Sequence, residues 1–488
     1  MSSNLIFFII VAYFGMLVAV SFYTARGADT HAFFTANKRS PWWLVAFGMI
    51  GTSISGVTFI SVPGEVGSGQ FAYFQFVLGN LVGYFIIATV LLPLYYRLNL
   101  ISIYTYLEKR FGFWSYKTGA FFFLVSRTVG AAFRLFLAAA VLQIGLFDDW
   151  GVPFEINVLI TIVLIWVITF KGGIKTIIWT DSLQTIFLVS AVIISVVLIG
   201  RELGLSAGGL LQTVKDSDYS RVFFFDNPKD SKYFFKKFFA GMFIAIAMTG
   251  LDQDLMQKNL TCKNLKEAQK NMFSFCLVFV VINLLFLTLG ALLYLYSTRE
   301  GISLPARADY LFPTLALKHF GALAGISFLL GIIAASYASA DSALAALTTS
   351  FCIDFLEFGK RPETERLRLK TIVHLSFSFL LFIVILIFNK INDQSVVSAV
   401  FTAAGYTYGP LLGLYAFGLF TKLPVRDRFV PFICLASPIL CYIINTHSQE
   451  WLNGYQFGFE LLILNGALTF LGLLLVSKRL PVETIVKM

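Results

Sequence analysis

Charged side chains are scarce in this sequence. Only 13% of its 488 residues are Asp, Glu, Lys or Arg, whereas 58% are hydrophobic, and the mean hydropathy is +0.79. Soluble domains carry about 25% charged residues, so this chain lacks the polar surface that a soluble protein of its length needs. The composition therefore predicts an integral membrane protein that lies in the lipid bilayer.

The sequence also lacks the motifs of several enzyme and binding classes. Its five cysteines show no CxxC spacing and its four histidines are scattered, so neither a disulfide framework nor a zinc site is predicted. It contains no GxSxG, HExxH or P-loop motif. The formal net charge is +10, but the Lys and Arg residues form no concentrated basic cluster. We therefore expect no enzyme, no ATP-driven pump and no nucleic-acid partner.

Long apolar segments are what the sequence has instead. A helix needs roughly 20 apolar residues to cross a bilayer, and by that rule we predict about 13 spanning helices. They start near Leu5, Trp42, Phe71, Tyr116, Val152, Ile174, Tyr233, Lys266, His319, Leu369, Ser395, Arg428 and Phe457. The first lacks a basic N-terminal region and a cleavage site, which favours a retained helix over a signal peptide. The longest loop, Gly200–Lys237, is predicted to lie on the outer surface with a short interfacial helix.

The Lys and Arg residues indicate an orientation. With the N-terminus outside, most of them fall in segments that face the cytoplasm, and the short outer loops 64–70 and 148–155 contain none. The positive-inside rule therefore favours an outer N-terminus, a cytoplasmic C-terminus and an odd number of helices. Residues 1–488 are expected to form a single multi-pass domain, and the short tails favour a bacterial inner membrane.

Two of the predicted helices are interrupted by small and polar residues. The second span contains GTSISG at 51–56, and the seventh contains GLDQD at 250–254, five helices later. Glycine weakens a helix, and non-helical backbone at membrane depth is tolerated only where it is buried in protein or lines a cavity. Close packing of helices through small residues is the alternative. Paired interruptions of this kind point to the binding site of a secondary transporter.

Carboxylates lie within two predicted spans. Asp181 belongs to the sixth, and Asp341 belongs to the ninth, where Ser339 and Ser342 share one helix face. A charged side chain at membrane depth costs about 2.5–3.5 kcal/mol on insertion scales, so it faces a partner, water or an ion. Carboxylate, hydroxyl and carbonyl oxygens suit a hard cation such as Na⁺. A polar network that joins helices is the alternative.

Two arginines lie seven residues apart in the fourth span. Arg127 and Arg134 therefore share one face of the helix. Each either pairs with a protein carboxylate or binds an anionic group of a substrate.

Four stretches of the sequence resemble the solute:sodium symporter family. They are SISGVTFISVPGE, ISIYTYLEKRFG, GGIKTIIWTDSLQ, and the ninth span through SFCID, which AAGYTYGPLLGLYAFGLF follows later. The resemblance covers almost the whole chain and implies an all-α membrane fold with a core of five plus five helices in inverted repeats. It implies an extra N-terminal helix at 1–25, a first repeat at 42–200, a second at 233–421, and C-terminal helices with a short tail at 428–488.

The resemblance also implies a Na⁺ site between the second and ninth spans. Its ligands would be the carbonyls of Gly51, Ile54 and Ala335 and the hydroxyl of Ser339. Many members have a hydroxyl residue at the position of Ala338, and this chain lacks that ligand.

Some members of the family bind a further Na⁺. The corresponding positions are Asp181, Asp341 and Ser342. The carboxylate of Asp341 either strengthens this second site or supplies the oxygen that Ala338 does not.

The solute is expected beside the broken second span. The predicted contacts are Ser53, Ser55, Thr58, Phe76, Asn80, Arg127, Arg134, Gln253, Tyr406 and Tyr408. For Thr58, Phe76 and Tyr408, ordinary packing is the alternative.

The predicted function is Na⁺-coupled import of a small organic solute by alternating access, with Na⁺ as the coupling ion and a monomer as the working unit. The membrane potential contributes about 2.3 kcal/mol per charge per 100 mV to such transport. A proton-coupled carrier that uses Asp341 or Asp181 is the alternative. The family carries sugars, sialic acids, amino acids, vitamins, carboxylates and inorganic anions, and the two arginines favour an acidic solute.

Overall fold

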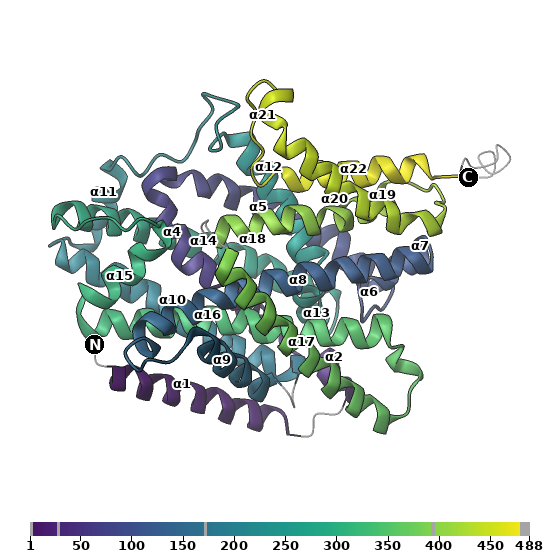
Figure 1. Cartoon of the computed structure of the whole chain (residues 1–488), viewed down its shortest axis with the longest axis horizontal. Helices are drawn as coiled ribbons and strands as arrows, with labels where there is room; N and C mark the ends of the chain where they lie inside the picture. Colours follow the sequence, from purple (N-terminus) through teal and green to yellow (C-terminus); the bar gives the residue numbers. More distant parts are fainter. Residues whose placement is uncertain (1–2, 27–29, 170–172, 392–395, 479–488) are drawn as a thin grey trace.

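The computed structural model describes residues 3–26, 30–169, 173–391 and 396–478 (Figure 1). Within these ranges the chain forms helices and connecting loops, with two isolated β-bridges and no strand. Most of the long helices lie along the horizontal axis of Figure 1, and the N-terminal helix runs along the lower edge. The all-helical fold predicted from the sequence is confirmed.

The helices of ten or more residues are α1 (Ser3–Thr24), α3 (Trp42–Ser53), α4 (Gly56–Gly69), α5 (Tyr73–Ile86), α8 (Phe113–Leu142), α9 (Phe154–Thr169), α10 (Gly173–Glu202), α11 (Ala207–Asp216), α12 (Phe234–Ala245), α14 (Leu265–Arg299), α16 (Gly321–Ser350), α17 (Glu363–Ile391), α18 (Val396–Thr407), α19 (Gly409–Phe420), α20 (Val430–Thr446) and α22 (Leu461–Leu475). The shorter ones are α2 (Thr30–Thr35), α6 (Leu92–Arg97), α7 (Thr105–Arg110), α13 (Gln253–Asn259), α15 (Leu311–Lys318) and α21 (Ser448–Trp451).

The described part of the chain has eight helices that are long and apolar enough to span a membrane, and a ninth if the bent pair formed by α12 and α13 is one span. Five further apolar helices, namely α3, α9, α18, α19 and α22, are shorter than a full span. The second predicted span is split at Ile54 and Ser55, and the eleventh is split at Tyr408. These breaks and the short helices explain why the predicted number of about 13 spans is not confirmed.

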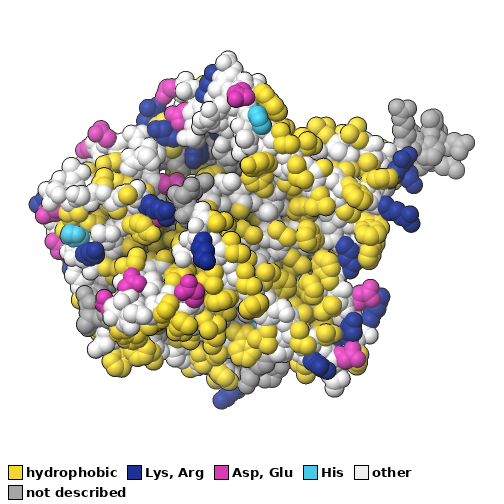
Figure 2. Space-filling view, viewed as in Figure 1, with side chains coloured by type: hydrophobic (Ala, Val, Ile, Leu, Met, Phe, Trp, Pro, Cys, Tyr) yellow, Lys and Arg dark blue, Asp and Glu magenta, His cyan; other side chains and the backbone are white. Residues whose placement is uncertain are grey.

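The surface is apolar where a bilayer would contact it. Hydrophobic side chains form a broad band across the face shown in Figure 2, while Lys, Arg, Asp and Glu gather mainly toward its ends. Large side chains such as Phe8, Leu277, Phe379 and Phe432 are exposed on four different helices. Exposed apolar area of this extent marks a surface that lipid covers. The chain is therefore a multi-pass membrane protein.

The centre of the fold is built around α16. Every residue from Gly331 to Ser350 is buried, and this stretch consists largely of Ala, Ser and Thr. Small residues allow helix backbones to approach closely within a membrane protein, and α16 packs against α10, α8, α3 and α4. The carboxylates and hydroxyls of α16 therefore lie deep in the protein and away from lipid.

The loop predicted between residues 200 and 237 contains one short helix. This helix is α11, and the segment that follows it is irregular up to the start of α12. The expectation of a short helix in this loop is confirmed.

Candidate functional site

The helices α3 and α4 are separated by the two non-helical residues Ile54 and Ser55. The backbone hydrogen bonds of α3 end where the N–H of Ile54 donates to the carbonyl of Ile50 (2.8 Å), and those of α4 begin where the N–H of Phe59 donates to the carbonyl of Ser55 (3.1 Å). The last carbonyls of a helix have no partner within it. The interruption predicted in the second span is confirmed, and it leaves the carbonyls of Gly51 and Ile54 without helical partners at membrane depth.

Two glycines allow this break to fit between α10 and α16. A Cβ atom on Gly51 would overlap the hydroxyl of Thr185 on α10, and one on Gly56 would overlap the hydroxyl of Ser336 on α16. Thr185 in turn donates a hydrogen bond to the carbonyl of Phe47 on α3 (2.8 Å). The broken segment is therefore held from both sides by the two most central helices.

The predicted ligands on α16 are buried beside this break. Ser339, Asp341 and Ser342 are at most 1% exposed. The hydroxyl of Ser336 and Oδ2 of Asp341 have no hydrogen-bond partner among the described residues. Ser336 was not predicted as a site residue, although it lies three residues before Ser339 and so on the same helix face.

A second break follows α12. The helix continues through a π-helical turn, η5 (Ile246–Gly250), and α13 then leaves at an angle of 69°. Asp252 lies in the bend and caps α13, because its Oδ1 accepts hydrogen bonds from the N–H groups of Asp254 (2.9 Å) and Leu255 (3.4 Å). The hydroxyl of Tyr408, at the junction of α18 and α19, donates to the other oxygen of Asp252. The interruption predicted in the seventh span is therefore confirmed.

Charged side chains of α13 join it to the central helices. Asp254 pairs with Arg127 on α8 and accepts a hydrogen bond from the hydroxyl of Ser342 on α16. Lys258, one turn further along the same face, pairs with Asp181 on α10 at an Nζ–Oδ2 distance of 2.5 Å. Two of the residues expected to bind a second Na⁺, Asp181 and Ser342, thus have protein partners in this structure.

The hydroxyl of Thr52 completes this cluster. It receives a hydrogen bond from Lys258 and donates one to Asp181 (3.0 Å). Asp254, Lys258 and Thr52 were not predicted as site residues. Thr52 and Asp254 belong to the two polar interruptions at 51–56 and 250–254, whereas Lys258 follows the second interruption and gives no separate signal.

Arg134 has a different environment from Arg127. Its Nη1 donates a long hydrogen bond to the hydroxyl of Ser339 (3.3 Å), and its Nε has no partner among the described residues. No carboxylate in the described part of the chain forms an ion pair with Arg134, whereas Arg127 is paired with Asp254. Of the two arginines on this face of α8, Arg134 is the one whose charge is not neutralised by a direct partner.

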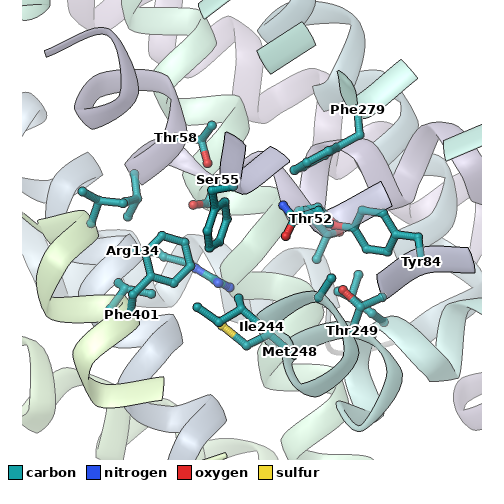
Figure 3. A pocket seen from close by; sticks show the side chains of 18 of the residues that line it. Thr52, Ser55, Thr58, Tyr84, Arg134, Ile244, Met248, Thr249, Phe279 and Phe401 are labelled. Atoms are coloured by element: carbon teal, nitrogen blue, oxygen red, sulfur yellow. The ribbon is translucent and has the colours of Figure 1, made fainter. Parts of the chain in front are cut away.

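A cavity of about 80 Å³ lies between the two breaks. In Figure 3 the guanidinium of Arg134 points into it, between Ser55 and Met248. The residues that line it are Thr52, Ser53, Ser55, Val57, Thr58, Tyr73, Phe76, Asn80, Tyr84, Arg127, Arg134, Ile244, Ala245, Met248, Thr249, Leu255, Phe279, Val397, Val400 and Phe401. The hydroxyl of Ser53 and Oδ1 of Asn80 are buried without a partner among the described residues.

The cavity brings together seven of the predicted solute contacts: Ser53, Ser55, Thr58, Phe76, Asn80, Arg127 and Arg134. Three others lie elsewhere. The side-chain amide of Gln253 bonds to the backbone of Ile101 (2.8 Å) and of Ile103 (2.9 Å), Tyr406 accepts a hydrogen bond from Asn445 (3.0 Å), and Tyr408 donates to Asp252. Gln253 is directed away from the cavity because α13 starts immediately after the bend.

The oxygen atoms around the first break fit a hard monovalent cation. The available groups are the carbonyls of Gly51 and Ile54, which have no helical partner, and the buried hydroxyls of Ser336 and Ser339; such oxygens are ligands that Na⁺ accepts. The carbonyl of Ala335 belongs to the uninterrupted helix α16. No group of three or more His, Cys, Asp or Glu side chains that could hold a metal ion is found in the described ranges. Neutral oxygen ligands of this kind suit an alkali cation.

Comparison with known proteins identifies the family of this chain. The model of the sodium:solute symporter family matches residues 33–424. The sodium/sialic acid symporter NanT of Aliivibrio fischeri is 27% identical over 440 residues, which cover 84% of this chain and 82% of the relative. The human sodium-coupled monocarboxylate transporter 1 is 27% identical over 444 residues, covering 84% of this chain and 68% of the relative. The human sodium/iodide cotransporter is 25% identical over 410 residues, covering 81% of this chain and 62% of the relative.

Two solved structures share the fold. A Na⁺-coupled sialic acid symporter in its substrate-bound outward-open state superimposes with a TM-score of 0.81 at 18% identity, over 98% of this chain and 100% of that one. A nucleobase-cation-symport-1 family transporter in a closed conformation superimposes with a TM-score of 0.54 at 14% identity, over 90% of this chain and 92% of that one. These likenesses show that the chain shares its overall fold with the two transporters.

Proposed function

Because the chain belongs to the sodium:solute symporter family and so couples solute transport to Na⁺, we propose that its solute is a small carboxylate and that Arg134 binds the carboxylate group. One observation carries this proposal: Arg134 lines the cavity without a carboxylate partner, while the neighbouring Arg127 is already neutralised by Asp254. The chain is thus a transporter and not an enzyme.

The guanidinium of Arg134 is suited to a carboxylate ligand. An unpaired charge in a low-dielectric site is costly, so an anion that enters the cavity removes that cost. Arginine presents its N–H groups in a planar fork that matches the two oxygens of a carboxylate. The Nε of Arg134, which lacks a partner, is one such group.

The remaining walls fit the uncharged part of a small organic acid. Tyr73, Phe76 and Met248 provide apolar contact, and Ser53 and Asn80 offer polar atoms that have no protein partner. The cavity volume of about 80 Å³ is several times the roughly 10–15 Å³ that one water needs on a comparable measure, so the cavity has room for a small organic solute.

The relatives named above agree with an acidic solute. Sialic acid, monocarboxylates and iodide, which appear in their names, are all anions at neutral pH. We infer the carboxylate class because the apolar walls of this cavity favour an organic anion over a halide.

The same geometry links Na⁺ to the solute through Ser339. In this proposal, Na⁺ is held by the carbonyls of Gly51, Ile54 and Ala335 and by the hydroxyl of Ser339. The hydroxyl of Ser336 supplies the side-chain ligand that Ala338 cannot provide. Arg134 donates to the oxygen of Ser339. A cation bound to that oxygen competes with this hydrogen bond and releases Arg134 toward the solute.

Alternating access follows from the position of the break. Na⁺ at this site ties the α3–α4 link to α16, which orders the broken segment that lines the solute cavity. Solute then binds to the ordered state, the two helix sets rock against one another, and both ligands leave on the other side.

We also propose that the N-terminus is outside and the C-terminus inside. The loops predicted to be cytoplasmic contact one another: Arg110 donates to the carbonyl of Thr421 (2.8 Å), and Asp427 accepts from the N–H of Ser115 (2.8 Å). The N-terminus lies at the opposite end of the molecule in Figure 1. The positive-inside rule assigns the basic end to the cytoplasm, and in this proposal a monomer is the working unit in a bacterial inner membrane.

Uptake into liposomes that contain the purified protein tests the solute class. With an inward Na⁺ gradient, we expect uptake of at least one of the small carboxylates acetate, lactate and pyruvate. Sialic acid is tested as a larger acid, and glucose is the neutral control. A K⁺ gradient should not support uptake. Uptake of glucose without uptake of any carboxylate would refute the proposal.

A variant of the arginine tests the binding mode. Arg134→Met should abolish the rise in melting temperature that the carboxylate causes, and should keep the rise that Na⁺ causes. Arg134→Lys keeps the charge but loses the fork, so we expect weaker carboxylate binding with a higher KM. Normal carboxylate uptake by Arg134→Met would show that the anion binds elsewhere.

A further inference from the structure

Lys258 places a cation where the sequence alone predicts a Na⁺ ion. Its side chain and that of Asp181 are both 0% exposed, and their charged atoms are 2.5 Å apart. The ammonium also donates to the hydroxyl of Thr52, the residue next to Gly51 in the first break. A lysine of α13 thus reaches the broken end of α3 and the carboxylate of α10 together.

The oxygen atoms around this ammonium form an incomplete cation site. Oδ1 of Asp181 and Oδ2 of Asp341 are buried, and no described residue forms a hydrogen bond with either of them. Asp341 is near enough to interact electrostatically with both Asp181 and Lys258. Two carboxylates and the hydroxyl of Thr52 would suit Na⁺, and the ammonium of Lys258 supplies the positive charge in its place.

We propose that the ammonium of Lys258 is a tethered cation that replaces a second coupling Na⁺, so that the protein carries one Na⁺ with each solute. The inference rests on the Na⁺ coupling described above and adds the stoichiometry. Without Lys258, the carboxylates of Asp181 and Asp341, which interact electrostatically, lose the cation between α13 and α10, and the site becomes available to Na⁺.

A purely structural ion pair predicts a different result. If Lys258 only stabilised the fold, its removal would lower the melting temperature and leave the number of bound Na⁺ ions unchanged. If Lys258 replaces an ion, its removal adds a binding event, and the count of bound Na⁺ separates the two roles.

The test is equilibrium binding of radioactive ²²Na⁺ to purified protein in detergent, with choline as the replacement cation and no solute present. We expect one Na⁺ per wild-type molecule and two per Lys258→Ala molecule. Asp181→Asn introduced into Lys258→Ala should return the count to one. Lys258→Arg keeps a tethered positive charge and should bind one Na⁺ per molecule.

Folding of each variant is checked by its melting temperature. If Lys258→Ala does not fold, Lys258→Gln, which keeps a hydrogen-bond donor beside Thr52 and Asp181 but no charge, takes its place. Two bound Na⁺ are expected in this variant, and one would overturn the inference. Two Na⁺ in the wild type, or one in a folded Lys258→Ala, would also overturn it and leave Na⁺ coupling intact. A wild type that binds no Na⁺ would overturn the coupling as well.

Discussion

Removing the guanidinium of Arg127 leaves the carboxylate of Asp254 buried, with the hydroxyl of Ser342 as its one remaining side-chain partner among the described residues. Breaking a buried ion pair from one side costs about 3–5 kcal/mol, because the remaining charge is uncompensated. Arg134→Met is the matched control on the same helix face. It removes one long hydrogen bond to Ser339, so we expect a loss below about 1.5 kcal/mol.

The assay uses the buried cysteines of the protein. All five are free thiols and all are buried, so a thiol-reactive fluorophore reports unfolding as the temperature rises. We expect Arg127→Met to melt well below the wild type and Arg134→Met to melt close to it. Neutralising the partner in Arg127→Met with Asp254→Asn should restore most of the loss. Equal melting of the two arginine variants, or no recovery in the double variant, would refute the assignment of the ion pair.

Three further predictions concern the first break and the cavity. Na⁺ at 100 times its Kd stabilises the folded wild type by about 2.7 kcal/mol. Ser339→Ala should reduce this gain in thermal melts, with K⁺ as the control salt. An unchanged gain would show that Ser339 does not bind Na⁺. Gly56→Ala should lose uptake and about 1–3 kcal/mol of stability through overpacking against Ser336, whereas Gly15→Ala, with no atom within 4 Å of the added Cβ, should behave as wild type. Asn80→Ala should raise the KM for the carboxylate, since this side chain lines the cavity with an unpartnered oxygen, and an unchanged KM would contradict its contact with the solute.

Local features of the fold were predictable because local chemistry causes them. The glycines and hydroxyls at 51–56 and the GLDQD stretch at 250–254 interrupt long apolar runs, and both helices break there. Carboxylates in apolar spans must be buried away from lipid, and the side chains of Asp181 and Asp341 are buried in the protein. The split of the eleventh span at Tyr408 was missed, although Gly409 and Pro410 follow it and a Gly-Pro pair marks a break in a helix.

The partners of the charged groups could not be predicted from the sequence. Lys258 and Asp181 are 77 residues apart, and Arg127 and Asp254 are 127 apart. Which of two arginines on one helix face is neutralised depends on how α13 leaves its bend. That same bend turns Gln253 toward the loop before α7 and away from the cavity. These are properties of helix packing, which the spacing of residues along one chain does not encode.

The ion pair between Lys258 and Asp181 also has an electrical consequence for the proposed transport cycle. With that cation fixed to the protein, one Na⁺ and one carboxylate cross the membrane together and move no net charge. The membrane potential, at about 2.3 kcal/mol per charge per 100 mV, then adds nothing to the loaded step. The inside-to-outside ratio of the solute is limited by the Na⁺ ratio alone, so that a tenfold Na⁺ gradient, about 1.4 kcal/mol, supports a tenfold accumulation. In this proposed cycle, a single lysine makes uptake electroneutral and independent of voltage in its loaded step.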